Sequence, residues 1–270
     1  MKLQKKVKRW ARGALRGRGG QAAALFLLWG LTWGAVSLAD RAVFRLVGHY
    51  LGWFGGAQPD WRRQIGALWV SGAAVLVRAV LLAPLSAGAA AWFSALGAGR
   101  QRCVSTLLWP YTNWVWFRAL GVRLYTGAAV GAAALGPLLA AGGAWWLLRD
   151  RLAGLSPGGQ RLAAALGAGA ALLWLLAVRV WSQRYALALL LIGPDYGFTA
   201  AEAVALSVRC TRGYRWRLTM LELSFLPWFA ACLLVLPALY VLPYYTACRI
   251  GYGQYLYHRS CRRTGARARG

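Results

Sequence analysis

The stretch QAAALFLLWGLTWGAVSL, residues Gln21–Leu38, decides the fold class because none of its 18 side chains is charged. A helix of about 18 or more apolar residues can cross the hydrocarbon core of a bilayer, which is about 30 Å thick. Three further apolar runs follow, at Ile65–Val77, Leu124–Leu148 and Leu162–Val178. Basic residues flank these runs, as they flank transmembrane helices. We therefore predict an all-α fold, that of a polytopic helical membrane protein.

The chain of 270 residues is strongly basic: 32 Lys and Arg against six Asp and Glu give a net charge of +26. A charge of this size usually indicates a polyanionic partner. Here the basic residues bracket apolar runs instead of forming one face. The 16 Trp and 12 Tyr lie mostly near the ends of these runs, where an aromatic belt forms. The predicted partner is therefore the lipid bilayer with its anionic headgroups, and a nucleic acid is not expected.

We predict about six transmembrane helices within a single helical domain, residues 21–258. They are expected at Gln21–Ala39, at Val75–Leu96, at Leu124–Leu148, from about Leu162, at Leu218–Leu236 and from about Pro243. Two other segments, Arg41–Phe54 and Thr199–Arg212, are predicted to be amphipathic helices at the membrane surface. Thr199 and Glu202 have the spacing of a capping box, and Gly213 is placed to end that helix.

The positions of the basic residues also predict the orientation. With six spans, 23 basic residues fall on the side of the N-terminus and seven on the opposite side. The positive-inside rule then places both termini on the cytoplasmic side of a bacterial plasma membrane. Five spans are the alternative, which would leave the basic tail, residues 259–270, outside. Arg78 lies within an apolar run and is expected to extend its guanidinium to the headgroups.

Residues 1–20 are predicted to form a polybasic cytoplasmic arm with eight positive charges and no acid. Basic side chains near an anionic surface contribute about 1 kcal/mol each to lipid binding. The residues expected to contact anionic lipid are Lys5, Lys6, Lys8, Arg9 and Arg12. The arm, the apolar run and Ser37-Leu38-Ala39 also resemble a secretory signal. An uncleaved first helix is favoured because the run is long and further spans follow it.

Glu222 is the only acid inside a predicted span, and it defines a candidate polar site. An ionisable group within a bilayer is costly and usually faces a partner or a watery cavity. We expect Glu222 to pair with Arg179 or Arg249, and a proton or cation site is the functional alternative. No catalytic, metal or cofactor site is predicted. The motifs of nucleotide-binding proteins and hydrolases are missing, and the five cysteines lack the spacing of a metal site.

The last third of the chain carries a longer pattern. Its members are Asp195, Thr199, Glu202, Ala203, Ser207, Gly213, Trp216, the run Leu221–Phe225, Trp228, Pro243, Tyr244 and Tyr252. Over about Tyr185–Tyr257 the chain thereby resembles the bacterial integral-membrane family named domain of unknown function 975, although Pro227 stands where a small residue is expected. The segment Pro84–Phe93 resembles the second helix of that family. The resemblance implies a multi-span plasma-membrane protein, and it implies no activity and no catalytic residues.

The function predicted from these features is non-enzymatic: a protein that organises or assists other membrane components. Its expected partners are anionic lipid and a second membrane protein. The alternative is a small permease or transporter subunit with Glu222, Arg249 and Arg179 in a polar interior. A solvent-connected cavity at Glu222 would favour transport, and tight packing there would favour the first hypothesis. A lipid-modifying enzyme ranks last because clusters of polar residues are missing.

Overall fold

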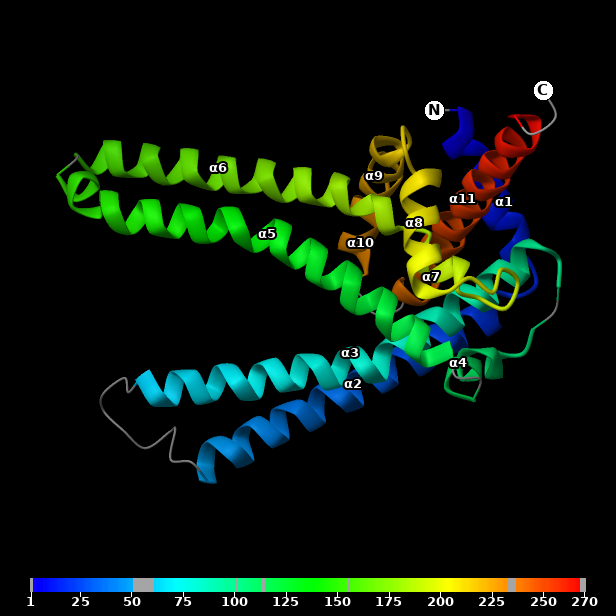
Figure 1. Ribbon diagram of the computed structural model, residues 1–270, viewed down its shortest axis with the longest axis horizontal. Helices are drawn as coiled ribbons and strands as arrows, with labels where there is room; N and C mark the ends of the chain where they lie inside the picture. Colours follow the sequence, from blue (N-terminus) through cyan, green and yellow to red (C-terminus); the bar gives the residue numbers. More distant parts are fainter. Residues whose placement is uncertain are drawn as a thin grey trace.

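The computed structural model describes residues 2–50, 61–100, 102–112, 115–154, 156–232 and 237–267, and every regular element in these ranges is helical. Figure 1 shows two long hairpins that extend from a compact end. The hairpins consist of α2 (Gly19–Tyr50), α3 (Trp61–Gly97), α5 (Val115–Ala153) and α6 (Pro157–Ser182). The compact end contains α1 (Lys2–Leu15), η1 (Val104–Leu107), α4 (Trp109–Thr112), η2 (Gln183–Tyr185), α7 (Ala188–Leu191), α8 (Ala200–Cys210), α9 (Arg215–Leu223), α10 (Leu226–Ala231) and α11 (Ala238–Arg267). The predicted all-α class is confirmed.

Four segments of the described ranges are long and apolar enough to cross a membrane. They are Gly19–Tyr50, Trp69–Gly97, Val115–Gly143 and Gly158–Leu191. Helix α2 packs against α3 and α5 packs against α6, so each pair forms an antiparallel hairpin (Figure 1). These four helices indicate a membrane protein, whereas the described ranges do not reach the predicted count of six spans.

The outer parts of the hairpins expose apolar side chains. Leu31 on α2, Leu139 on α5 and Leu173 on α6 are each at least 70% exposed. On α3 the contrast falls within one helix, because Trp69 is 77% exposed and Phe93 is 1% exposed. Apolar surfaces of this extent are stable against lipid and unfavourable against water. The outer parts of the hairpins are therefore the surfaces that a bilayer would cover.

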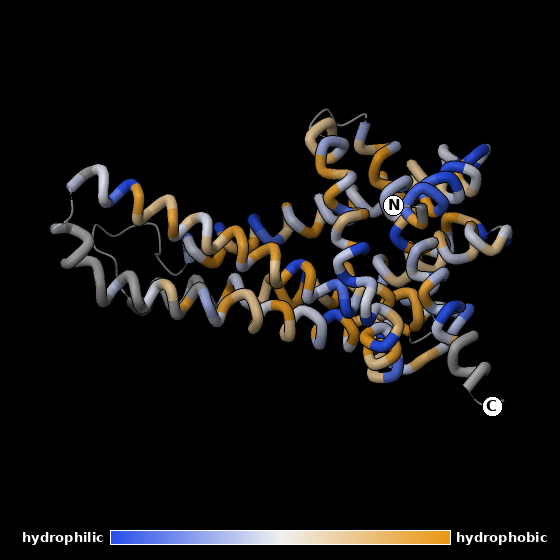
Figure 2. Tube along the Cα trace, turned by 90° about the horizontal axis from the view of Figure 1, so that it is seen from above, coloured by the Kyte–Doolittle hydropathy of each residue, from blue (hydrophilic) through white to orange (hydrophobic). Residues whose placement is uncertain are grey.

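The compact end is built around the inner half of α3 and the middle of α11. Phe93, Phe225 and Tyr252 are the largest side chains fully buried there. The first and last helices, α1 and α11, both lie at this end (Figure 1). Hydrophilic segments also gather there, whereas apolar residues recur along the hairpins (Figure 2). One end of the molecule thus combines a protein core with most of the charge.

The predicted polybasic arm is helical over Lys2–Leu15 and packs against α11. Val7 and Ala11, four positions apart on one face of α1, are buried. Lys5 and Lys6 lie on the exposed face. The helix is therefore a part of the compact end that presents its basic face outward.

Trp10 fixes the position of α1. Its indole lies so close to Gly251 of α11 and Gly97 of α3 that a methyl group on either glycine would overlap the ring. Glycine is required at such close approaches because it has no Cβ. The two glycines therefore form the slot that admits the Trp10 ring between α3 and α11.

The prediction of a separate surface helix at Arg41–Phe54 was wrong over its described part, since α2 continues without interruption to Tyr50. Residues 51–54 lie outside the described ranges. Asp40 does not end the helix because it has a partner on the neighbouring helix: the Nε of Arg78 donates a hydrogen bond to Asp40 Oδ2 over 2.9 Å. Arg78 therefore pairs with Asp40 across the α2–α3 hairpin, whereas the sequence predicted that its guanidinium extends to the headgroups.

The segment predicted as the fifth span, Leu218–Leu236, is not one continuous helix. Helix α9 ends at Leu223, and α10 begins at Leu226 with Pro227 in its first turn. Proline has no amide hydrogen to continue the hydrogen-bond ladder of the preceding helix. Positions 233–236 lie outside the described ranges. Helix α11 already begins at Ala238, so Pro243 lies inside it and does not start it.

The predicted start and end of the helix after Thr199 are confirmed. The Thr199 hydroxyl accepts a hydrogen bond from the amide of Glu202, and the Glu202 carboxylate accepts one from the amide of Thr199. These reciprocal bonds lower the pKa of the Glu202 carboxyl below its ordinary value. Gly213 has φ +81°, a conformation that favours glycine and ends the turn after α8.

Candidate functional site

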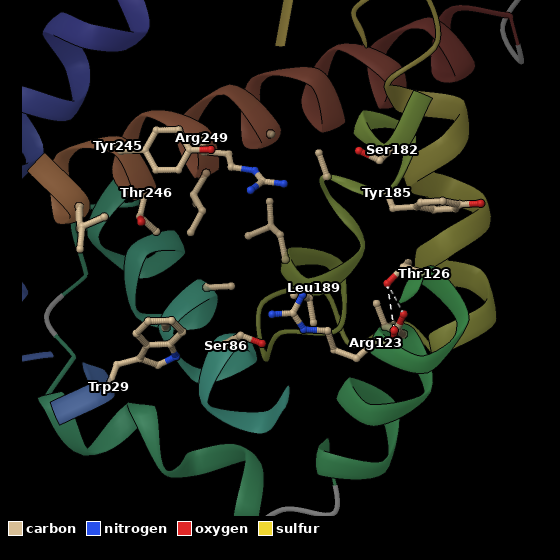
Figure 3. Close-up of a pocket in the computed structure, with 18 of the residues that line it drawn as sticks. Trp29, Ser86, Arg123, Thr126, Ser182, Tyr185, Leu189, Tyr245, Thr246 and Arg249 are labelled. Atoms are coloured by element: carbon tan, nitrogen blue, oxygen red, sulfur yellow. Dashed lines mark hydrogen bonds between the residues drawn. The ribbon is translucent and has the colours of Figure 1, made fainter. Parts of the chain in front are cut away.

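A cavity of about 580 Å³ lies where the two hairpins meet the compact end. Helices α2, α3 and α5 supply part of its wall, and the end of α6, the segment η2–α7 and α11 supply the remainder (Figure 3). Much of its lining is apolar and includes Phe26, Trp29, Val130, Leu189 and Ile250. Its charged lining residues are Arg123, Arg179 and Arg249, with no acid among the described side chains of the wall.

Glu222 lies next to this cavity and accepts hydrogen bonds from several donors. The Nη2 of Arg179 is 2.7 Å from its carboxylate, and the Nε2 of Gln183 donates to Oε2 over 2.7 Å. The hydroxyl of Tyr245 donates to Oε1 over 2.9 Å. The Nη1 of Arg249 is farther away, at 3.8 Å from Oε1. The carboxylate is therefore neutralised mainly by Arg179, and Arg249 contributes a weaker ion pair.

The partners of Glu222 arrive as two pairs with the spacing i and i+4, which places both members on one face of a helix. Arg179 and Gln183 come from the end of α6 and the turn after it, and Tyr245 and Arg249 come from α11. Glu222 belongs to the last turn of α9. The cluster thus joins three elements that are far apart along the chain.

The three residues of the predicted polar site are brought together, and the pairing expected for Glu222 is found with both arginines. Sequence reasoning missed Gln183 and Tyr245. Their spacing of four residues from Arg179 and from Arg249 was a usable signal, because a buried acid in a helical protein recruits donors from one face of a neighbouring helix.

Arg123 was also missed as a site residue. It directly precedes the predicted span Leu124–Leu148, and its sequence context does not distinguish a basic residue that flanks a span from one that lines a cavity. Figure 3 shows Arg123 on α5 and Arg249 on α11 with their guanidinium groups directed into the same cavity. Among the hydrogen bonds and ion pairs of the described residues, none involves the Arg123 guanidinium. Its charge therefore has no protein counter-ion within the described chain.

The residues predicted to contact lipid all lie on α1 but divide into two groups. Lys5, Lys6 and Arg9 are exposed. Lys8 donates a hydrogen bond to the Ser224 hydroxyl over 2.9 Å and lies over the ring of Phe225. The Nε of Arg12 donates to the Tyr244 hydroxyl, and this bond raises the pKa of Arg12 above its ordinary value. Lys8 and Arg12 thus also hold α1 to the protein, although Arg12 is itself exposed.

A second ion cluster stabilises the loop before α8. Asp195 accepts hydrogen bonds from Arg100 over 2.9 Å, from Arg102 over 3.0 Å and from the Ser94 hydroxyl over 2.8 Å. These bonds connect the end of α3 to the segment that precedes Thr199. Within the described ranges, no three His, Cys, Asp or Glu side chains are grouped to hold a metal ion.

Comparison with protein families gives one match: residues 170–260 fit the model of a family described as protein of unknown function (DUF975). The resemblance inferred from the sequence is confirmed over this stretch. No curated protein and no solved structure matches the chain. The matched residues include Arg179, Glu222, Tyr245 and Arg249, whereas Arg123 and the α2–α3 hairpin lie outside them.

Proposed function

We propose that the protein is a non-enzymatic multi-pass protein of the bacterial plasma membrane, which organises or assists other membrane components at the cytoplasmic surface. One observation carries the proposal: two hairpins with exposed apolar surfaces hold a compact end that contains most of the basic residues. The hairpins would anchor the chain, and the compact end would lie against anionic headgroups. A second membrane protein is the further partner we propose.

The basic surface of the compact end supports this proposal. Lys5, Lys6 and Arg9 are exposed on α1, and Arg209 and Arg212 are exposed at and after the end of α8. Exposed cations close to an anionic leaflet contribute about 1 kcal/mol each to membrane attraction. Several such residues on two elements would orient the compact end on the inner leaflet.

We further propose that the membrane is crossed four times, with both termini in the cytoplasm. The earlier count of six would require α9–α10 and α11 to cross as well. Helices α9 and α10 contain nine and six residues and are interrupted at Ser224 and Phe225. The ~20 residues of a full span would need about 30 Å of helix. Helix α11 has 30 residues but is not among the four segments that are both long and apolar enough to cross. We therefore place α9, α10 and α11 at the inner surface.

The alternative, a small permease or transporter subunit, is supported by one observation, the cavity beside Glu222. The hydrogen bonds and the ion pair that Glu222 already makes argue against its acting as a proton or cation carrier. A carrier acid must release its partners during each cycle, whereas this carboxylate is held by Arg179, Gln183 and Tyr245 together. Counterflow measurements in proteoliposomes that show saturable transport abolished by Glu222→Gln would favour the permease.

The proposed function is tested by lipid analysis of the full chain extracted from its membrane in polymer nanodiscs. Anionic lipid should be enriched around the wild type relative to the bulk membrane, and Lys5→Gln, Lys6→Gln and Arg9→Gln together should reduce the enrichment. A matched control removes three exposed arginines from the opposite ends of the hairpins, Arg41, Arg45 and Arg161. Equal enrichment in both triple variants, or none in the wild type, would contradict the proposal. The same preparation shows whether a second membrane protein is retained.

A further inference from the structure

The charge of the cavity is unbalanced. Three arginines line it, and a single carboxylate, that of Glu222, lies beside it. Arg179 satisfies that carboxylate at 2.7 Å, together with the neutral donors Gln183 and Tyr245. The Nη1 of Arg249 is farther from it, at 3.8 Å. The cavity therefore holds about two positive charges more than the described protein compensates.

Arg123 is exposed and the Arg249 side chain is 36% exposed, so both guanidinium groups are open at the cavity surface. An arginine at the depth of a bilayer is unfavourable unless an anion or a ligand accompanies it. Arg123 and Arg249 come from opposite walls, α5 and α11, and both guanidinium groups are directed into the space between them (Figure 3). Guanidinium is well suited to phosphate because its planar N–H groups bind two oxygens at once. The opposed pair thus has the arrangement of a clamp for a phosphate group.

Thr246 adds a neutral donor to this clamp. Its hydroxyl belongs to the cavity wall one turn before Arg249 and makes no hydrogen bond within the described part of the chain. The Thr246 side chain is half-buried, so its hydroxyl is open to the cavity and free to donate. A phosphate oxygen in the cavity would provide the acceptor that this group lacks.

The remaining wall indicates what the phosphate is attached to. Phe26 and Trp29 of α2, Val130 of α5, and Leu189 give the cavity an apolar lining beside its cationic centre. An inorganic phosphate would leave that lining uncovered, whereas an amphiphile would cover it. The volume of about 580 Å³ falls in the range of ligand pockets and suits a headgroup with the first part of its chains.

We propose that the cavity binds one anionic glycerophospholipid, with its phosphate between Arg123 and Arg249 and the Thr246 hydroxyl. The acyl chains pass over the apolar lining and leave along the exposed apolar surfaces of the hairpins. Arg179 remains bound to Glu222 and keeps the α6 and α11 walls in place. This site rests on the proposed function only in requiring that the hairpins stand in a bilayer, and it is separate from the basic surface of α1.

The proposal is tested by native mass spectrometry of the delipidated full chain, titrated with phosphatidylglycerol. The variants are Arg123→Gln, Arg249→Gln and both together, and Arg161→Gln, which removes an exposed charge at the far end of α6, is the matched control. One phosphatidylglycerol should bind the wild type and the control with equal affinity. Each cavity variant should bind at least about tenfold more weakly, as expected for the loss of a charge-assisted contact to phosphate. Equal binding in the double variant and the control would overturn the proposal.

Two further arms identify the source of the phosphate. Phosphatidylcholine, which carries no net charge, should bind more weakly than phosphatidylglycerol. Glycerol 3-phosphate and inorganic phosphate should not displace the lipid at equal concentration. If either soluble anion binds tightly and the lipid does not, the ligand is a soluble phosphate and the lipid assignment is wrong. An unchanged thermal midpoint of unfolding in the variants excludes misfolding as the cause of lost binding.

The outcome is distinguishable from failure of the proposed function. Loss of three charges on α1 should reduce the anionic lipid that surrounds the protein and leave the single tightly bound lipid in place. Loss of Arg123 and Arg249 should remove the single tightly bound lipid and leave the anionic lipid that surrounds the protein unchanged. The absence of the tightly bound lipid in all proteins, with normal enrichment around the wild type, would refute the cavity site alone.

Discussion

Replacement of Glu222 tests whether the cluster around it stabilises the contact between α6, α9 and α11. The variant Glu222→Ala removes a carboxylate that is 2.7 Å from Arg179 and receives hydrogen bonds from Gln183 and Tyr245. It leaves Arg179 without its counter-ion and Gln183, which is 1% exposed, without an acceptor. Glu222→Gln removes the charge and keeps one acceptor oxygen, which serves one of the two neutral donors, because Gln183 and Tyr245 bind different carboxylate oxygens.

The magnitude follows from the exposure of the partners. Removal of one member of a fully buried ion pair costs about 3–5 kcal/mol, and an exposed pair is worth about 0–1 kcal/mol. The Glu222 side chain is 13% exposed and that of Arg179 is 48% exposed, so the pair lies between these limits. We expect Glu222→Ala to lower the free energy of unfolding by about 2–4 kcal/mol. Glu222→Gln should lower it by about 1–3 kcal/mol, because one neutral hydrogen bond of about 1 kcal/mol survives.

The assay is reversible unfolding of the purified protein by SDS in mixed micelles, combined with a double-mutant cycle between Glu222→Gln and Arg179→Gln. Coupling of at least about 1 kcal/mol is expected because the two side chains are in contact. Additive effects, or a Glu222→Ala protein as stable as the wild type, would refute the inference that this ion pair holds the three elements together.

Three further predictions concern the compact end. Gly251→Ala should destabilise the protein by about 1–3 kcal/mol, since its methyl group would overlap the indole of Trp10; in a Trp10→Ala background the loss should shrink, as measured by the same unfolding assay. Glu202→Gln should lower stability at neutral pH, and this loss should disappear only once the pH has fallen below the folded pKa of Glu202. The folded pKa of Glu202 lies below the unfolded value, so its contribution is complete above the unfolded pKa and is lost as pH falls through the folded one. Burial raises the pKa of the Cys248 thiol to about 12, so at pH 8 maleimide should label the exposed Cys103 and spare Cys248 until the chain unfolds.

Controls and contrary outcomes are available for each. Gly34→Ala, at a position with open space around its Cβ, should leave stability unchanged or slightly higher. Equal losses at Gly34 and Gly251 would exclude the overlap with Trp10 as the cause. A Glu202→Gln effect that does not decrease as the pH falls through the acidic range would show that the carboxylate does not act through its charge. Rapid labelling of Cys248 in the folded protein would contradict its burial in the contact between α1 and α11.

The fold class was predictable because membrane helices are recognisable from their length, their apolar composition and the basic residues that flank them, as in Gln21–Leu38. Features that depend on neighbours within a few residues were also predicted correctly. These are the capping box at Thr199 and the end of the turn at Gly213. Long-range pairing was harder to predict. Asp40 looked like the end of a span because its partner, Arg78, is 38 positions away, and the sequence gives no measure of that approach.

The candidate site was predictable only in part, for the same reason. An acid in an apolar context is conspicuous, so Glu222 and its arginines were found. Arg123 looks like any basic flank, and its importance depends on the wall of α11 opposite it. The basic arm was misjudged in another way, since its net charge concealed the apolar face that packs on α11. Val7 and Ala11 share that face at a helical spacing, and this pattern was present in the sequence.

The most direct test of the central claim concerns which side of the membrane holds the start of α11. The claim is that two hairpins cross the bilayer and the compact end stays in the cytoplasm. In a chain with its native cysteines replaced, Ala238→Cys is treated in intact cells with a membrane-impermeant maleimide, and Gly154→Cys at the tip of the second hairpin is the accessible control. Four crossings predict that Gly154→Cys is labelled and that Ala238→Cys is labelled only after the membrane is opened. Labelling of Ala238→Cys from outside would contradict the account and establish that α10 and α11 cross the membrane as a third hairpin.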